Sequence, residues 1–221
     1  MTIANPEISA APSLAYGAPR TALLMVDPYN DFMTEGGKLY GAIKAVADGN
    51  NMFANMRSIM AKVRSAGIQV FVVPHHRFHE GDFDKWMNVC QVQQQAIDMQ
   101  AFANDTWGGE FNTEFGPADG DIVIYEHMGQ NGFANTNLEV QLKQHNIDKL
   151  ILIGMIANSC IESTGRMAME LGYHVTLVTD ATSAFSAEAM YAAHSVNGPA
   201  YAHSMLTTVQ LLEQISAPVS A

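Results

Sequence analysis

Short runs of apolar residues alternate with stretches of helical periodicity along most of the chain. The runs are "TALLMVDP", "IQVFVVPHH", "DIVIYEH", "KLILIGM", "HVTLVTDA" and a short one near "SMLTT". Helical patterns cover residues 41–66, 136–146 and 159–171, and another begins near residue 186. Continuous apolar runs, rather than alternating ones, indicate parallel strands covered by helices on both faces. The pattern therefore predicts an α/β fold.

Residues 76–120 break this rhythm and contain both tryptophans of the chain. A loop this long in a compact domain is usually functional. No repeat, low-complexity tract or interior linker is visible, so we interpret residues 19–221 as a single domain. Residues 1–18, rich in Ala, Pro and Ser, are expected to form an arm that extends or packs on a neighbour.

Composition and charge narrow the choice of partners. The 22 acidic and 11 basic residues give a formal net charge of -11, which disfavours a nucleic acid or an anionic membrane surface as partner. No apolar run approaches the roughly 18 residues of a membrane span, and the N-terminus does not resemble a secretion signal. Two cysteines in 221 residues do not suggest a disulfide framework. We expect a cytoplasmic protein with reduced thiols.

Reactive side chains stand at the ends of three predicted strands. Asp27 ends the first strand, Glu126 and His127 end the third, and Cys160 follows the fourth. Small ligands of such folds bind beyond the carboxyl ends of the strands. A carboxylate can accept the proton of a nearby thiol, and a helix N-terminus favours a thiolate. Taken singly, however, Asp27 is also explained as a turn residue and Cys160 as a small buried hydrophobe.

Two stretches carry a resemblance to a known family: "TALLMVDPYNDF" around Asp27, and residues 120–186, which run from "GDIVIYEHMGQNGF" to "GYHVTLVTDATSAFS" and include Cys160. With the spacing between them they cover most of residues 20–210. The chain resembles the isochorismatase-like hydrolases, chiefly the cysteine hydrolases among them. The resemblance implies a three-layer α/β/α fold with a mainly parallel central sheet and a triad of Asp, Lys and Cys.

The resemblance also assigns roles. It makes Asp27 the general base and Cys160 the nucleophile that cleaves an amide or related C–N bond through a covalent intermediate. It implies a cis peptide bond between Met155 and Ile156. The backbone amides of Ile156 and Cys160 would then form an oxyanion hole.

The family lysine is missing from this chain. Counting back six residues from Phe133 places His127 at its position, preceded by Glu126. His127 is a proton donor of similar reach, and Glu126 is then its orienting partner or a substrate contact. Alternatively, His127 is a packed core residue. Without a fixed ammonium group Asp27 and Glu126 lie in a more negative site, which favours a neutral or cationic substrate.

Other residues are candidates for the pocket. Phe32, Trp86 and Trp107 are candidate walls, and Asn131 stands where the family often has Ser. Some relatives hold a metal after the second strand, but "PHHRFHEGD" lacks their Asp-x-His spacing. We interpret it as a histidine-rich surface loop and expect no metal and no cofactor, with a zinc site as the alternative.

We expect a cysteine hydrolase that cleaves a C–N bond of a small molecule. One alternative is a vinyl-ether hydrolase of the isochorismatase type, which uses Asp and lacks the cysteine. The other is a catalytically silent binding or assembly protein that has lost the lysine. The resemblance further implies a homo-oligomer, either a dimer or a tetramer.

Overall fold

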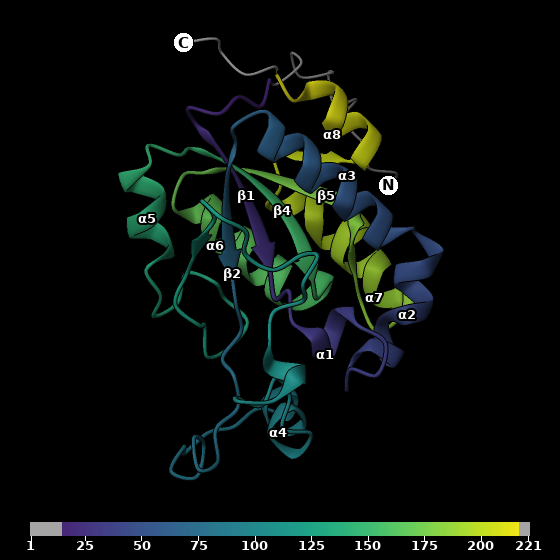
Figure 1. The fold of residues 1–221 in the computed structure, drawn as a ribbon, viewed down its shortest axis with the longest axis vertical. Coiled ribbons are helices and arrows are strands. Elements are labelled where there is room, and N and C mark those ends of the chain that lie inside the picture. Colours follow the sequence, from purple (N-terminus) through teal and green to yellow (C-terminus); the bar gives the residue numbers. More distant parts are fainter. Residues whose placement is uncertain (1–14, 217–221) are drawn as a thin grey trace, which may run out of the picture.

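A six-stranded sheet forms the centre of the molecule in the computed structural model, which describes residues 15–216 (Figure 1). The strand order is β3-β2-β1-β4-β5-β6, and every pairing between these strands is parallel. This confirms the predicted fold class. The bounds are β1 Thr21–Val26, β2 Gln69–Val73, β3 Ile122–Val123, β4 Lys149–Met155, β5 His174–Ser183 and β6 Ser204–Leu206.

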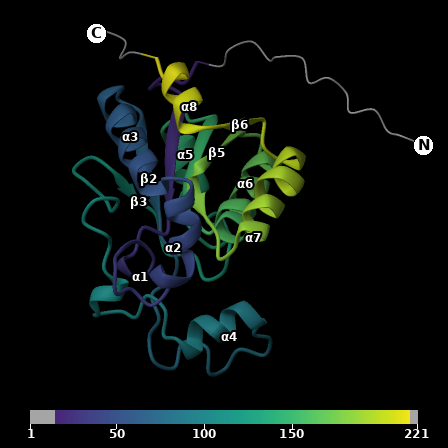
Figure 2. The same cartoon turned by 90° about the vertical axis from the view of Figure 1, so that its right-hand side faces the viewer.

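Helices cover both faces of the sheet (Figure 2). Helices α2, α3 and α8 contribute to one apolar cluster, and α5 and α6 contribute to the other. The helices are α1 Asn30–Met33, α2 Tyr40–Gly49, α3 Met52–Ser65, α4 Gln91–Asp98, α5 Leu138–Gln144, α6 Glu162–Glu170, α7 Ala187–Tyr191 and α8 Thr208–Gln214. Of these, the sequence pattern did not predict the short helices α1, α4 and α8.

Strand β1 shows why the apolar runs are continuous. Leu23 and Met25 point into one apolar cluster, whereas Ala22, Leu24 and Val26 point into the other. Successive side chains of a strand alternate between the two faces of the sheet, and both faces of this sheet are covered. All six residues of β1 are therefore buried.

The predicted helix over 41–66 is in fact two helices, α2 and α3, separated at Asn51. Asn51 adopts the left-handed conformation with φ 56°, which Asn tolerates better than most residues. The side chains of Asn50 and Asn55 on either side donate hydrogen bonds to the carbonyls of Thr182 and Asp180. The break therefore attaches both helices to β5.

The predicted strand over 121–127 is interrupted. Only Ile122–Val123 is regular strand, and the Tyr125 amide donates to the side chain of Asn137 instead of to β2. Pairing with the segment after β2 resumes at His127, whose amide donates to the Pro74 carbonyl at 3.0 Å. His127 thus returns to the end of the sheet after the interruption.

Both ends of the described chain lie together. Tyr16 is buried, pairs with Ile215 and shares a 2.7 Å hydrogen bond with the Thr176 hydroxyl. Residues 15–18 of the predicted arm therefore pack on the domain itself, and residues 1–14 lie outside the described part of the chain. None of the helices between residues 15 and 216 is long and apolar enough to cross a bilayer.

Gly154 lets β4 pass close to the end of β1. Its φ is +113°, and a Cβ built there would lie 2.2 Å from the carbonyl oxygen of Val26. Only glycine, which has no Cβ atom, can adopt this positive φ and also allow the Val26 carbonyl to approach so closely. The ends of β1 and β4 can therefore come together beside Asp27.

Replacing Gly154 by Ala is expected to destabilise the fold more than replacing Gly172 by Ala. Gly172 also has a positive φ, +86°, but nothing lies within 4 Å of its built Cβ. Both variants lose roughly 1–2 kcal/mol to the backbone conformation. Only Gly154→Ala adds a clash, which costs about 1–3 kcal/mol more. Urea denaturation of both variants measures the difference, and equal destabilisation would contradict the proposed close approach.

Candidate active site

The site lies where the strand order of the sheet reverses. From β1 the chain builds the sheet outward through β2 and β3, and from β4 it builds in the other direction through β5 and β6. The segments that follow the carboxyl ends of the adjacent strands β1 and β4 lead away in opposite directions and leave a crevice between them. Asp27 follows β1 and Cys160 follows β4 by five residues, so both lie at this crevice.

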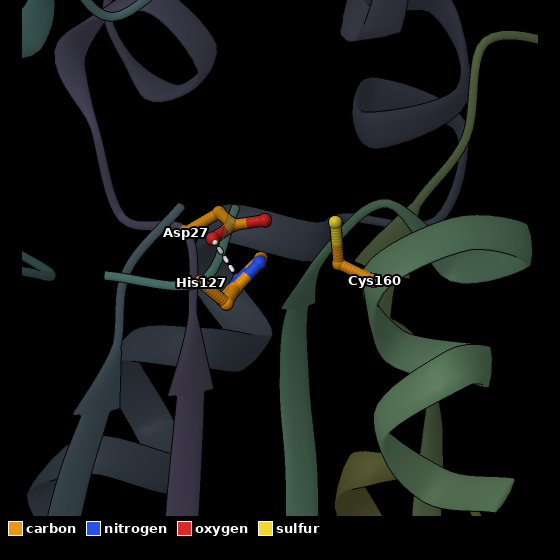
Figure 3. Close-up of side chains that lie close together, drawn as sticks. All are labelled: Asp27, His127 and Cys160. Carbon is orange, nitrogen blue, oxygen red and sulfur yellow. Dashed lines mark hydrogen bonds and ion pairs between the residues drawn. The ribbon is translucent and has the colours of Figure 1, made fainter. Parts of the chain in front are cut away.

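Asp27 and His127 form a buried pair at the end of β1. The Nε2 atom of His127 lies 3.1 Å from Oδ1 of Asp27, and both residues have no exposed surface (Figure 3). Asp27 adopts φ 56°, a left-handed conformation uncommon for non-glycine residues. Such conformations cost about 1–3 kcal/mol and persist where the surrounding structure imposes them, often at functional sites.

The contacts of His127 require it to carry two protons. Its Nδ1 atom lies 2.8 Å from the carbonyl oxygen of Gly129, and its Nε2 atom faces the Asp27 carboxylate. Both partners only accept hydrogen bonds, so both ring nitrogens must donate. Burial lowers the pKa of His127, but the charge and hydrogen bond of Asp27 outweigh it and raise the pKa above the usual value. The raised pKa and the two acceptors together favour the imidazolium form of the ring.

Cys160 faces the other oxygen of Asp27. Figure 3 shows this oxygen directed toward the sulfur. One ligand atom from each of Asp27, His127 and Cys160 lies within 4.8 Å of the other two. Within residues 15–216, Oδ2 of Asp27 is buried and has no hydrogen-bond partner apart from the thiol itself. A free carboxylate oxygen is thus available to receive the thiol proton.

The resting sulfur is a thiol and not a preformed thiolate. Burial and the negative charge of Asp27 raise the pKa of Cys160 well above its usual value. The Ser159 side chain and the backbone amide of Ile156 act in the opposite direction but do not prevail. In the resting site, burial and the charge of Asp27 therefore outweigh any stabilisation of a thiolate by the helix N-terminus. The proton can move to Asp27 only as the sulfur forms a new bond.

The local chain brings the Ile156 amide to the sulfur. The Met155–Ile156 peptide bond is cis, and the following turn at Ala157–Ile161 is wider than an α-helix. The amides of Ser159 and Ile161 both donate to the carbonyl oxygen of Ile156, at 3.0 and 3.2 Å. The turn leads directly into α6 and holds Cys160 at its start.

A cavity of about 350 Å³ opens onto Asp27 and Cys160. Its floor includes Ile156 and Ser159, and Phe32, Phe102 and several residues of α4 form its walls. No lysine or arginine of the described chain lines it. His127 does not line it either, because it lies behind Asp27. The cavity therefore presents the thiols of Cys160 and Cys90 and one carboxylate oxygen among mostly apolar side chains, with the His75 ring, Ser159 and three glutamines as its other polar groups.

These features agree with comparisons to known proteins. The model of the isochorismatase domain matches residues 21–208. The chain belongs to the isochorismatase family. An uncharacterised isochorismatase family protein of Bacillus subtilis, YddQ, is 30% identical over 161 residues, which are 73% of this chain and 76% of the relative. The ureidoacrylate amidohydrolase RutB of Rhizobium rhizogenes is 29% identical over 176 residues, 73% of this chain and 70% of the relative.

Solved structures share the isochorismatase-family fold. A cysteine hydrolase from Pseudomonas syringae pv. phaseolicola superposes with a TM-score of 0.74 and 21% identity, covering 93% of this chain and 98% of that one. An N-carbamoylsarcosine amidase from Thermoplasma acidophilum gives a TM-score of 0.61 and 24% identity, covering 86% and 96%. At these identities the likeness establishes the fold alone.

Glu126 is not where the sequence suggested. Its carboxylate binds the Arg77 side chain at 2.6 Å and lies 3.3 Å from a ring nitrogen of His76. Burial raises the pKa of Glu126, but His76 and Arg77 outweigh this and lower it to about 2. Glu126 does not line the cavity, and the Gly129 carbonyl, not Glu126, orients the ring of His127. Asp27 and Glu126 therefore do not compete for one proton.

The predicted pocket walls are only partly correct. Phe32 lines the cavity and is buried. Trp86 and Trp107 are 40% and 48% exposed and are not among the lining residues. The Asn131 side-chain oxygen accepts a 2.8 Å hydrogen bond from the Phe133 amide in a local turn, and Asn131 also lies outside the cavity. Short loops around these residues, which sequence patterns do not specify, turn them away.

His75 lines the cavity, although sequence analysis placed it in a surface loop. Burial lowers its pKa, and the nearby charge of His127 lowers it further. Its Nδ1 atom lies 2.9 Å from the His76 carbonyl, so the neutral ring keeps its proton there and a lone pair on Nε2. The position directly after β2 is the sequence signal that could have identified it.

The described residues contain one group whose three side chains are close enough to share a metal ion: Asp27, His127 and Cys160. Aspartate, histidine and cysteine are all zinc ligands. The loop histidines form no such group in the part of the chain that the structure covers. His76 instead contacts Asp82 at 2.7 Å and Glu126 at 3.3 Å.

The raised pKa of His127 predicts a loss of stability with rising pH. The Asp27–His127 pair contributes fully below pH 6.5, the ordinary pKa of histidine, and its contribution disappears as the pH rises through the raised pKa. The loss is at most about 1.4 kcal/mol per pH unit. We expect His127→Gln to be less stable than the wild type at pH 6 and the difference to shrink as the pH rises above 6.5 and through the raised pKa of His127. Urea denaturation at each pH tests this, and a constant difference would contradict the imidazolium assignment.

Proposed function

We propose that this hydrolase cleaves a C–N bond of a small amide, ureide or carbamoyl compound with Cys160 as nucleophile. The observation that carries the proposal is the unpartnered Asp27 oxygen facing the Cys160 sulfur at the floor of a cavity. The relatives named as ureidoacrylate amidohydrolases support C–N hydrolysis. The presence of the thiol argues against a vinyl-ether hydrolase that relies on Asp alone.

The first half-reaction transfers the acyl group to the enzyme. The thiol proton of Cys160 moves to Asp27 while the sulfur bonds to the carbonyl carbon of the substrate. The backbone amides of Ile156 and Cys160 are placed to hold the developing oxyanion. The C–N bond then breaks, the proton on Asp27 passes to the leaving nitrogen, and an acyl or carbamoyl thioester remains on Cys160.

The second half-reaction releases the acid. A water molecule gives a proton to Asp27 and its oxygen bonds to the thioester carbon. When the C–S bond breaks, the proton on Asp27 returns to the sulfur and restores the thiol. Each half-reaction therefore begins and ends with Asp27 ionised. Cys160 is a thioester between the two half-reactions and a protonated thiol again after the second.

In this mechanism His127 acts through Asp27. It is fully buried behind the carboxylate and does not reach the cavity, so it cannot protonate the leaving group directly. Its Nε2 atom occupies one carboxylate oxygen of Asp27, so that the other oxygen faces the thiol. His127 thus takes over the charge of the family lysine.

Replacing Cys160 by Ala is expected to abolish turnover without unfolding the protein, because it removes the sulfur that must bond to the carbonyl carbon. Hydrolysis of a panel of amides, ureides and carbamates measures activity. Intact-mass analysis after rapid acid quench should show a covalent adduct in the wild type and none in Cys160→Ala.

The other cysteine, Cys90, is exposed and also lines the cavity, so Cys90→Ala is the control for the position of the adduct, which should remain on Cys160. Turnover should also survive dialysis against a chelator. Wild-type rates in Cys160→Ala would contradict the nucleophile assignment. Slow alkylation by iodoacetamide would not, because the resting thiol has a raised pKa.

The charge of His127 predicts how activity depends on pH. Activity should decline at alkaline pH as the imidazolium ion of the wild type loses its proton. His127→Lys restores a group with a reference pKa of about 10.4, so the decline should move to higher pH. His127→Gln, which has no charge, should lower kcat/KM by roughly 10²-fold, the lower range for a lost electrostatic contribution. Profiles of kcat/KM against pH for the three proteins test this, and an unchanged profile in His127→Lys would contradict the role.

A further inference from the structure

Helix α4 and its C-terminal end turn three apolar side chains toward the cavity, together with Gln93 and Gln95. Val92, Ala96 and Met99 follow one another at spacings of four and three residues, so they share one face, and all three line the cavity. No residue of α4 is buried, and Val92 is 53% exposed. Figure 2 shows α4 beyond the end of the sheet, apart from the two helical layers. Ala96 packs against the edge of the apolar core, whereas Val92 and Met99 are largely exposed and face the cavity.

The cavity opposite α4 is apolar and has no free cation. Phe32, Phe83 and Phe102 contribute aromatic rings to it. Its carboxylate, Asp27, is already paired with His127. The closest arginine in sequence to the lining residue His75, Arg77, is bound to Glu126 away from the cavity.

Resting on the proposed hydrolase function, we propose that the substrate is uncharged and presents an aryl or branched alkyl group to the face of α4 formed by Val92, Ala96 and Met99. A carboxylate in this cavity would lose its hydration and meet no cation. A substrate ammonium would also lose its hydration, and the one carboxylate there is neutralised by His127. The volume of about 350 Å³ suits a small molecule at the lower end of ligand pockets.

The test measures binding separately from chemistry. Cys160→Ala is titrated calorimetrically with 4-methylphenylacetamide and 4-carboxyphenylacetamide, which have nearly the same shape and differ in charge. The same titrations are made in Val92→Arg and Gln94→Arg, each combined with Cys160→Ala. Gln94 lies on the same helix, is exposed and does not line the cavity, so it is the matched control for the added charge.

We expect the methyl compound to bind Cys160→Ala with a Kd at least about tenfold lower than the carboxy compound, a difference typical of one unsatisfied polar group. Val92→Arg should reverse this order and Gln94→Arg should leave it unchanged. Equal or tighter binding of the carboxy compound to Cys160→Ala would overturn the proposal. So would the absence of binding by either amide, or equal effects of the two arginine variants.

Failure of the proposed function has a different signature. In that case the wild type would bind the methyl compound, with the expected preference over the carboxy compound, but would neither hydrolyse it nor form a Cys160 adduct. Circular dichroism and elution volume of each variant establish that the fold and the oligomeric state are unchanged. If Val92→Arg alters the elution volume and weakens both amides equally, the face of α4 is a subunit contact and the substrate assignment is wrong.

Discussion

The site depends on one buried ion pair, between Asp27 and His127. Removing two charges from water is costly, and breaking such a pair by deleting one partner typically costs about 3–5 kcal/mol. Here the pair also determines geometry, because the Gly129 carbonyl fixes the other ring nitrogen. The ring therefore holds one carboxylate oxygen and leaves the second one facing Cys160.

The same pair explains why the sulfur rests as a thiol. A cation beside the sulfur would favour the thiolate, but the cation here lies behind Asp27, and the carboxylate is the group that faces the sulfur. The resting site thus contains a thiol next to a carboxylate base, and not a thiolate that is already formed. His75, at the same crevice, stays neutral because it is buried beside the charged His127. Two histidines with opposite pKa shifts thereby acquire different chemical roles.

Much of this could be predicted from the sequence, because it depends on features local to the chain. The apolar runs predicted all six strands, and their ends correctly brought Asp27, His127 and Cys160 together. The partners of Glu126 could not be predicted, since Arg77 reaches it only across the interruption of β3. Helix α4 could not be predicted either. None of its residues is buried, so it lacks the continuous apolar stripe of a core helix.

The positive charge lies on a buried imidazole in place of the family lysine, and this difference affects which substrates the cavity can bind. The stem of a lysine is long and flexible, so its ammonium group can reach both the carboxylate and a ligand. The ring of His127 is fixed at both nitrogens and screened from the cavity by Asp27. Its charge can therefore support proton transfer but cannot bind a substrate anion. Substrate recognition then depends on the apolar walls. It depends above all on α4, because a ligand bound there would remove exposed apolar surface from water.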